Sequence, residues 1–274
     1  MNEHQSMEES SGFRLEVGFR FPERNVVIDR EEQTRLHHWC DIEPAVFGDV
    51  ADPALVTRLP VVMVANTIVA QRPDWGQVHT THRVLQRRPI LLGESLTLTG
   101  TIDGFVPHPR GEILQCSWVY QDANGEVALE VYPEALLIDP TIKPKQSAVK
   151  TRAKSQAEKT KHLFTKRCTP QATAGYCEGT SNLIHLDLAA AQRFGFRAPI
   201  IAGTQTMSFL LEAIYRGRSP HALALTIGFR RPVFWDDELA IVVTERENGS
   251  QYIQALNNTK KCVTDCLVEA DLEG

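Results

Sequence analysis

The chain lacks the marks of several large protein classes. No run of about 18 apolar residues is long enough to span a membrane, and the polar segment 1–12 does not have the charged-then-apolar order of a secretion signal. We therefore expect a cytoplasmic protein with no membrane partner. The net charge of -5 gives no overall attraction to nucleic acid, so a nucleic-acid partner is not expected either.

Paired cysteines and phosphate-binding loops are also missing. The six cysteines form no Cys-x-x-Cys pair and suggest no disulfide framework, so reduced thiols are expected. Two histidine groups, His37-His38 beside Cys40 and His79 with His82, come without a convincing third and fourth ligand, and we expect no metal. No Gly-rich phosphate loop or dinucleotide fingerprint occurs, so no cofactor is expected.

What is present is the composition of a soluble globular protein with an internal repeat. The 274 residues, 42% hydrophobic and 23% charged, suffice for one large domain or two ordinary ones. Residues 87–96 (RRPILLGESL) line up with residues 230–239 (RRPVFWDDEL). The offset, 231 minus 88, is 143 residues, close to half the chain. We interpret this as a duplication in which each half forms one domain.

Each half has the same order of expected elements. A proline leads into a nearly all-apolar stretch at 59–70 and again at 198–211, and both stretches predict a helix enclosed by its surroundings. Turn signals at 122–125 and 247–250 suit antiparallel hairpins. Strand-like runs follow each helix, at 95–102, 113–121 and 127–138 and then at 223–229, 239–246, 252–257 and 262–270.

The segment 141–161 separates the two halves. It is rich in lysine, contains a single acid, Glu158, and lacks apolar periodicity. We interpret it as a solvated basic linker between an N-terminal domain at 12–140 and a C-terminal domain at 162–274. The alternative is a basic surface for the phosphates of coenzyme A or for an acidic carrier protein.

One motif carries specific chemistry. It comprises residues 176–185 (YCEGTSNLIH), followed by 194–196 (FGF) and 198–203 (APIIAG). This resembles the signature of the MaoC-like enoyl-thioester hydratases, in which a Gly-Asp-x-Asn-Pro-x-His loop precedes a Pro-Ile-x-His-Gly turn. The matching positions are Asn182, His185 and Gly203. The family's Asp, Pro and second His positions read Thr180, Leu183 and Ala202.

The resemblance implies a fold and an activity. The fold is an α+β double hotdog, in which two antiparallel sheets each wrap a central helix and form an internal pseudo-dimer. The activity is that of an R-specific enoyl-thioester hydratase or 3-hydroxyacyl-thioester dehydratase. The substrate is an acyl-coenzyme A or an acyl carrier protein, so coenzyme A or phosphopantetheine arrives as part of the substrate. A homodimer of double hotdogs is a further expectation.

The chemistry needs groups that move protons and a donor for the thioester oxygen. His185 can exchange protons near neutral pH, and the resemblance makes it the catalytic base. Gly203 would present its backbone N–H at the positive start of a helix and let the substrate approach closely. The alternatives are that His185 is a hydrogen-bonded structural residue and that Gly203 packs against a neighbouring strand.

The other candidate residues surround these two. Thr180 can hold water or a thioester oxygen but cannot act as a carboxylate base, and Asn182 would orient the loop or the ligand. Glu178 is the candidate replacement for the missing carboxylate, whereas Asp187 is expected to cap a helix at 189–193. The remaining expected substrate-binding residues are Ile201, Ala202, Arg230 and Arg231.

The first half has no such loop. Its segment 44–60 contains Asp49 and Asp52 but no histidine, so we expect this half to form the wall of an acyl channel around residues 61–69, Trp75 and Phe105. Two other functions remain open from the sequence. The protein is alternatively a thioesterase or specialised lyase or isomerase on the same scaffold, or a degenerate subunit that binds acyl-thioesters without turnover.

Overall fold

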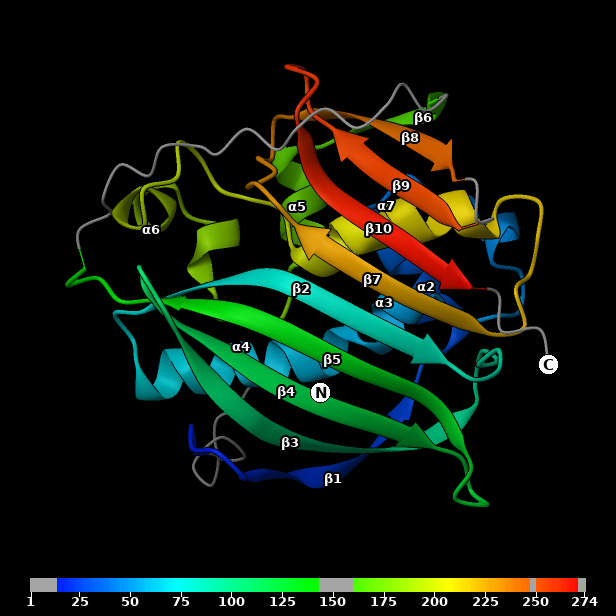
Figure 1. The fold of residues 1–274 in the computed structure, drawn as a ribbon, viewed down its shortest axis with the longest axis horizontal. Helices are drawn as coiled ribbons and strands as arrows, with labels where there is room; N and C mark the ends of the chain where they lie inside the picture. Colours follow the sequence, from blue (N-terminus) through cyan, green and yellow to red (C-terminus); the bar gives the residue numbers. More distant parts are fainter. Residues whose placement is uncertain (1–13, 143–159, 247–249, 271–274) are drawn as a thin grey trace.

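The computed structural model describes residues 14–142, 160–246 and 250–270. Within them, the chain forms one antiparallel 10-stranded sheet with helices against one face (Figure 1). The first half contains β1 (Arg20–Val27), α2 (Arg30–His38), η2 (Pro44–Val46), α3 (Pro53–Val56), α4 (Arg58–Gln71), β2 (Gly76–Gln86), β3 (Ser95–His108), β4 (Gly111–Gln121) and β5 (Val127–Ile138). The second half contains β6 (Thr160–Arg167), α5 (Pro170–Tyr176), η3 (Leu183–His185), α6 (Leu188–Arg193), α7 (Gly203–Tyr215), β7 (Leu223–Phe229), β8 (Glu238–Glu245), β9 (Gln251–Leu256) and β10 (Cys262–Ala270).

The two halves join edge to edge at β2 and β7. The strand order is β1-β3-β4-β5-β2-β7-β10-β9-β8-β6, so each half contributes one side of the sheet. The junction is an antiparallel ladder that runs from Thr81 opposite Gly228 to Gln86 opposite Leu223. The predicted α+β pseudo-dimer is confirmed, and its two sheets are continuous. Because β2 and β7 lie in the interior of this sheet, the paired edges are not available to other chains.

The repeat recurs in the backbone contacts. Leu91 bridges Val50 in the first half, and Phe234 bridges Ile200 in the second, at the same offset of 143 residues, 234 minus 91. In each half, the residue before the bridging Leu91 or Phe234 accepts a backbone hydrogen bond through its carbonyl oxygen. Ala51 N donates to Ile90 O at 2.8 Å, and Ile201 N donates to Val233 O at 2.9 Å. The repeated decapeptide therefore holds the start of the central helix in each half.

The two central helices differ in how completely they are enclosed. In α7 every residue is buried except Gly203 and Ala213, as predicted. Only Pro60, Val64, Ala65, Thr67 and Ile68 are buried in α4, so the prediction of full enclosure is wrong for that helix. Part of the reason is that Val61 and Val62 face a cavity rather than packed side chains, and the last residues of the helix, Ala70 and Gln71, are exposed to solvent.

The second helix starts at Gly203, as the motif predicted. The apolar stretch 198–211 is therefore helical only from Gly203 onward, and Pro199 lies in the segment before the helix rather than in its first turn. In α4 the proline, Pro60, does lie in the first turn. The continuous helical stretch Pro53–Gln71 is long and apolar enough to cross a membrane by composition alone, which is weak evidence because core helices of soluble proteins pass the same test.

The predicted linker falls largely on residues 143–159, which lie outside the described part of the chain. Its last two residues, Thr160 and Lys161, belong to β6. The larger of two hydrophobic clusters spans both halves and contains residues of both central helices. All six cysteines are free, in agreement with the expectation of reduced thiols.

Candidate active site

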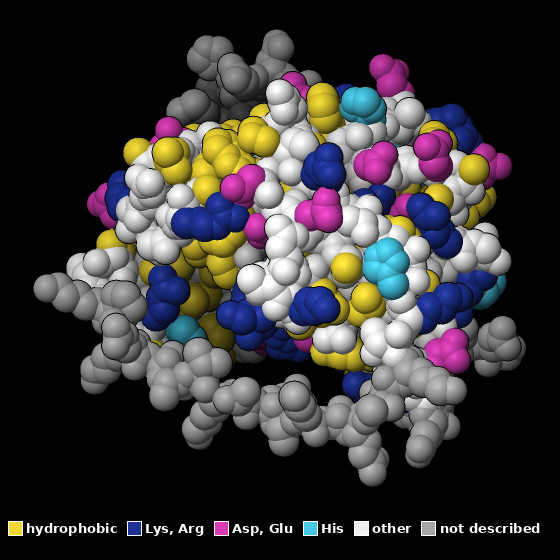
Figure 2. All heavy atoms as spheres, turned by 90° about the horizontal axis from the view of Figure 1, so that it is seen from above, with side chains coloured by type: hydrophobic (Ala, Val, Ile, Leu, Met, Phe, Trp, Pro, Cys, Tyr) yellow, Lys and Arg dark blue, Asp and Glu magenta, His cyan; other side chains and the backbone are white. Residues whose placement is uncertain are grey.

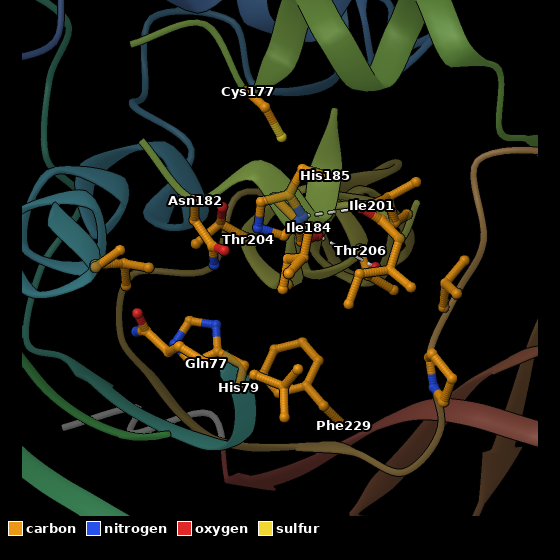
Figure 3. Close-up of a pocket in the computed structure, with 18 of the residues that line it drawn as sticks. Gln77, His79, Cys177, Asn182, Ile184, His185, Ile201, Thr204, Thr206 and Phe229 are labelled. Carbon is orange, nitrogen blue, oxygen red and sulfur yellow. Dashed lines mark hydrogen bonds between the residues drawn. The ribbon is translucent and has the colours of Figure 1, made fainter. Parts of the chain in front are cut away.

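A cavity of about 280 Å³ lies where the two halves meet. One wall is formed by the loop before η3, by η3 and by the start of α7. The other is formed by α4 and the first residues of β2. Figure 3 shows side chains from the two halves facing each other across this space. In the space-filling view, a hydrophobic hollow bordered by Lys and Arg side chains opens on the left side of the molecule (Figure 2). Neither half could form the cavity alone.

His185 is held in one orientation at the end of η3. Its Nδ1 lies 2.8 Å from the carbonyl oxygen of Ile200, and Ile200 N donates to Ile184 O at 3.2 Å. A carbonyl only accepts, so Nδ1 carries the proton and Nε2 keeps its lone pair in the neutral ring. Burial lowers the pKa of His185, and the bond to Ile200 offsets part of that shift. At neutral pH the residue is therefore an uncharged base on the cavity wall.

The loop before His185 is tied to the first half. Ser181 donates to Asn66 Oδ1 on α4 from its backbone N at 3.2 Å and from its hydroxyl at 2.6 Å. Arg58, also on α4, donates to the carbonyls of Tyr176 at 2.9 Å and Glu178 at 2.7 Å. These bonds fix the loop against the opposite wall of the cavity.

Thr180 and Asn182 both line the cavity, as predicted from the motif. The backbone N of Asn182 donates to Thr180 Oγ1 at 3.2 Å, which closes a tight turn. The hydroxyl of Thr180 keeps its own proton for a further acceptor. The two side chains can therefore hold a small polar molecule beside His185.

Glu178 is not where the sequence analysis expected it. Its side chain is 75% exposed and pairs with Arg35 of α2 at 2.8 Å, outside the cavity. The two-residue spacing from Thr180 carries it past the turn at Gly179, which has a φ of 82°, and onto the surface. Asp187 caps α6 through Oδ1, which accepts from Ala190 N at 2.6 Å, as expected. Among the described residues that line the cavity, none is Asp or Glu.

Gly203 begins α7 at the cavity wall. Its N-cap, Ala202, has no side chain that could bind the first-turn amides, so the positive end of the helix faces the cavity without a side-chain cap. A Cβ atom at Gly203 would lie 2.6 Å from Nδ1 of His79 on β2. The alternative role of close packing against a strand is therefore also met, and it coexists with the cavity-facing position.

The expected substrate-binding residues also reach the cavity. They are Ile201, Ala202, Gly203, Arg230 and Arg231. Arg230 is held by Asp265 through two bonds of 2.7 and 2.8 Å, so its charge is compensated. Arg58, Arg110 and Arg231 bind backbone carbonyls, and no carboxylate of the described chain pairs with them. Three uncompensated guanidinium groups make the lining electropositive.

Sequence reasoning missed the residues that the first half contributes. His79 and Gln77 come from β2, which had not been predicted as a strand, and Arg58 and Arg110 had not been singled out. His79 had been considered only as part of a metal site. In the described residues, no group of three His, Cys, Asp or Glu side chains could hold a metal ion. No local signal could have found His79, because only long-range strand pairing brings it to Gly203.

Comparison with known proteins agrees with this geometry. Residues 147–265 match the family model of the MaoC like domain. No curated protein matches the chain. HtdX of Mycobacterium tuberculosis has a TM-score of 0.72 at 20% identity, over 90% of this chain and 99% of that one. A MaoC-like dehydratase of Phytophthora capsici has a TM-score of 0.67 at 16% identity, over 91% and 95%.

A third structure names the fold. RV0216 of Mycobacterium tuberculosis, described as a double hotdog fold, has a TM-score of 0.61 at 15% identity, over 93% of this chain and 96% of that one. Two antiparallel sheets around two helices, with a cavity at their junction, thus define a double hotdog protein. Residues 147–265, mostly in its C-terminal half, match the model of the MaoC like domain, and this match supports a function of the hydratase or dehydratase type.

Proposed function

We propose that the protein is an enoyl-thioester hydratase, acting in reverse as a 3-hydroxyacyl-thioester dehydratase, with His185 as its base. One observation carries the proposal: the unprotonated Nε2 of His185 and the uncapped start of α7 share one cavity. The reaction requires a base, an acid that protonates C2 and a donor to the carbonyl; the imidazole can serve as base and then as acid, and the helix start supplies the donor. The described lining has no acidic residue, so the proton transfers fall to the imidazole.

The reaction follows from that placement. The thioester oxygen accepts a hydrogen bond from the Gly203 amide, which polarises the conjugated double bond. His185 takes a proton from a water molecule held by Thr180 and Asn182 while the water oxygen bonds to C3. The electron pair of the double bond moves toward the thioester, which gives an enolate. The resulting imidazolium returns the proton to C2, and the carbonyl forms again. Dehydration is the same sequence reversed.

The walls suit the two ends of such a substrate. Arg58, Arg110 and Arg231 offer positive charge for the phosphates of coenzyme A or phosphopantetheine. Val61 and Val62 of α4 offer an apolar surface for the acyl group. A second, smaller hollow of about 10 Å³ shares Val61 with this cavity and is also lined by Leu114 and Cys116. We propose that coenzyme A or phosphopantetheine enters only as part of the substrate.

The test is an assay with purified protein. The absorbance of the conjugated thioester in crotonyl-coenzyme A should fall as 3-hydroxybutyryl-coenzyme A forms. His185→Ala should lower turnover by about 10²–10⁴. His162→Gln, which removes an exposed imidazole on β6, is the matched control and should behave as wild type. Unchanged turnover in His185→Ala would contradict the role of His185. Release of free thiol would instead identify a thioesterase, and saturable binding without turnover would identify a binding subunit.

A further inference from the structure

We propose that His79 is a second hydrogen-bond donor to the thioester oxygen, so that the carbonyl site at the start of α7 is completed by both halves of the chain. The proposal rests on the proposed thioester substrate and adds a residue that the C-terminal motif does not contain. It assigns to the first half a direct role in the chemistry, beyond that of a channel wall.

The position of His79 follows from an irregularity in the sheet. In β2 the pairing with β5 shifts register between His79, opposite Ala135, and Thr81, opposite Glu134. Such a bulge re-aims the side chains beside it. The ladder with β7 begins only at Thr81, so His79 lies just outside the junction of the two halves. Figure 3 shows its ring on the β2 side of the cavity, opposite His185 and Thr204.

Close contact fixes the ring against the start of α7. A Cβ on Gly203 would lie 2.6 Å from Nδ1 of His79 and 3.2 Å from its Cβ and Cγ, so only glycine leaves room for this approach. The ring stacks on Phe229 of β7, with centroids 5.1 Å apart and planes 10° from parallel. A group that binds the Gly203 amide is therefore within reach of the imidazole of His79.

The charge state suits a donor that transfers no proton. Burial, together with the nearby His185, lowers the pKa of His79 to about 4, so its ring is neutral at pH 7. The groups that face it are His82, whose pKa is also lowered, His185 and the positive end of α7. A neutral imidazole beside a helix start can polarise a carbonyl through its N–H, as in enzymes that stabilise enediolates.

His82 is the contrast that makes the assignment specific. Its ring lies 5.5 Å from that of His79, yet it is fully buried and does not line the cavity. Neither of its nitrogens has a hydrogen-bond partner in the described structure. Of the two histidines on β2, only His79 reaches the substrate. Two donors on the oxygen stabilise the enolate more strongly than one, which lets a single imidazole base act without a carboxylate.

The test measures the polarisation of the bound thioester carbonyl and does not require turnover. Binding of 2,4-hexadienoyl-coenzyme A labelled with ¹³C at the thioester carbonyl should lower the carbonyl stretching frequency, measured by difference infrared spectroscopy. His79→Phe should lose much of that shift and lower kcat by about 10²–10³ with a smaller change in KM. His79→Gln keeps an N–H donor and should retain part of both. His162→Gln serves again as control.

The outcomes separate this inference from the hydratase proposal. A wild-type shift that is lost in His79→Phe supports the inference even if no hydration occurs. A wild-type shift and kcat that His79→Phe leaves unchanged overturn it, even if His185→Ala abolishes hydration. Absence of any wild-type shift also overturns it. If His79→Phe does not fold, Gly203→Ala provides the second variant, because its methyl group displaces the ring of His79 and should reduce the shift.

Discussion

His37 and Asp52 form a buried pair at the start of the first central helix. His37 Nε2 lies 3.1 Å from Asp52 Oδ2, and the two side chains are 1% and 0% exposed. Asp52 also accepts from Ser208 of α7 at 2.8 Å, and its Oδ1 accepts from Ala54 N at 2.8 Å. One carboxylate therefore caps α3, the short helix before α4, and ties it to α7, the central helix of the second half.

Replacement of Asp52 should therefore cost stability rather than chemistry. Asp52→Ala leaves His37, Ser208 and the cap of α3 without their partner, and we expect a loss of about 3–5 kcal/mol in the free energy of unfolding. Asp52→Asn keeps an acceptor for the cap and should lose less. Urea denaturation of both variants measures the difference. Equal stability of Asp52→Ala and wild type would contradict the importance of this contact.

A second buried pair, Lys166 and Glu212, allows a single variant to be compared with a double variant. Lys166 Nζ lies 2.8 Å from Glu212 Oε2, with side chains 3% and 0% exposed. Lys166→Met leaves Glu212 with only the half-exposed Arg216, so we expect a loss of about 3–5 kcal/mol. The double variant Lys166→Met with Glu212→Leu should recover much of it, because no buried charge remains unpaired. Equal losses in the single and double variants would count against this explanation.

The half-buried histidines His79 and His185 should make stability fall in mildly acidic solution. Burial lowers the pKa of His79 from 6.5 to about 4 and also lowers the pKa of His185. Between pH 6.5 and about pH 4, His79 binds a proton in the unfolded chain but not in the folded chain. The stabilisation from His79 is thus full above pH 6.5 and is lost as pH falls toward 4, by up to about 3 kcal/mol.

Denaturation curves at pH 7.5, 5.5 and 4.5 measure this slope. His79→Gln removes one of these titrating groups and keeps His82 and His185, so its stability should fall less steeply than that of wild type. His162→Gln removes an exposed imidazole and should keep the wild-type slope. Identical slopes for His79→Gln and wild type would show that His79 is not the source.

Glu178 provides a test of the corrected site. Because its carboxylate pairs with Arg35 on the surface, Glu178→Gln should leave kcat/KM unchanged and alter stability by less than about 1 kcal/mol. Thr180→Val, in contrast, removes the hydroxyl on the cavity wall and should lower kcat. A large loss of turnover in Glu178→Gln would restore the carboxylate role that its sequence position suggested.

The sequence predicted the strands in which apolar and polar residues alternate and the strands that consist of a continuous apolar run. β4, β5 and β7 to β10 fall close to the expected ranges because their apolar side chains face the core. β3 starts at Ser95 as expected but continues past residue 102 to His108, where its residues are mostly not buried and the alternation stops. β1 and β6 are edge strands with mostly exposed residues, so their sequences lack the apolar pattern that indicates a strand. β2 contains two residues each of Thr, His and Gln, and its first residues line the cavity, so its sequence does not show the apolar pattern that predicted the other strands.

The candidate site likewise combines residues that the sequence predicted with residues that it did not. His185, Asn182, Thr180 and Gly203 belong to one local motif, and the structure brings them to one cavity. Glu178 is close to them in sequence, but a turn at Gly179 directs it outward. His79 is more than 100 residues away from His185 in the chain, and its position depends on the register shift in β2. Short-range patterns carry no information on such a contact.

The ladder between β2 and β7 gives the fused chain a freedom that a symmetric pair of identical subunits does not have. In such a pair every substitution occurs twice, so a residue cannot serve one reaction centre without appearing in the other. Here the segment 44–60 carries Asp52 in a stabilising contact, while the corresponding stretch before α7 carries the imidazole. Under the proposed function, the molecule has one reaction centre in place of two equivalent ones, and each copy of the repeat has a different task.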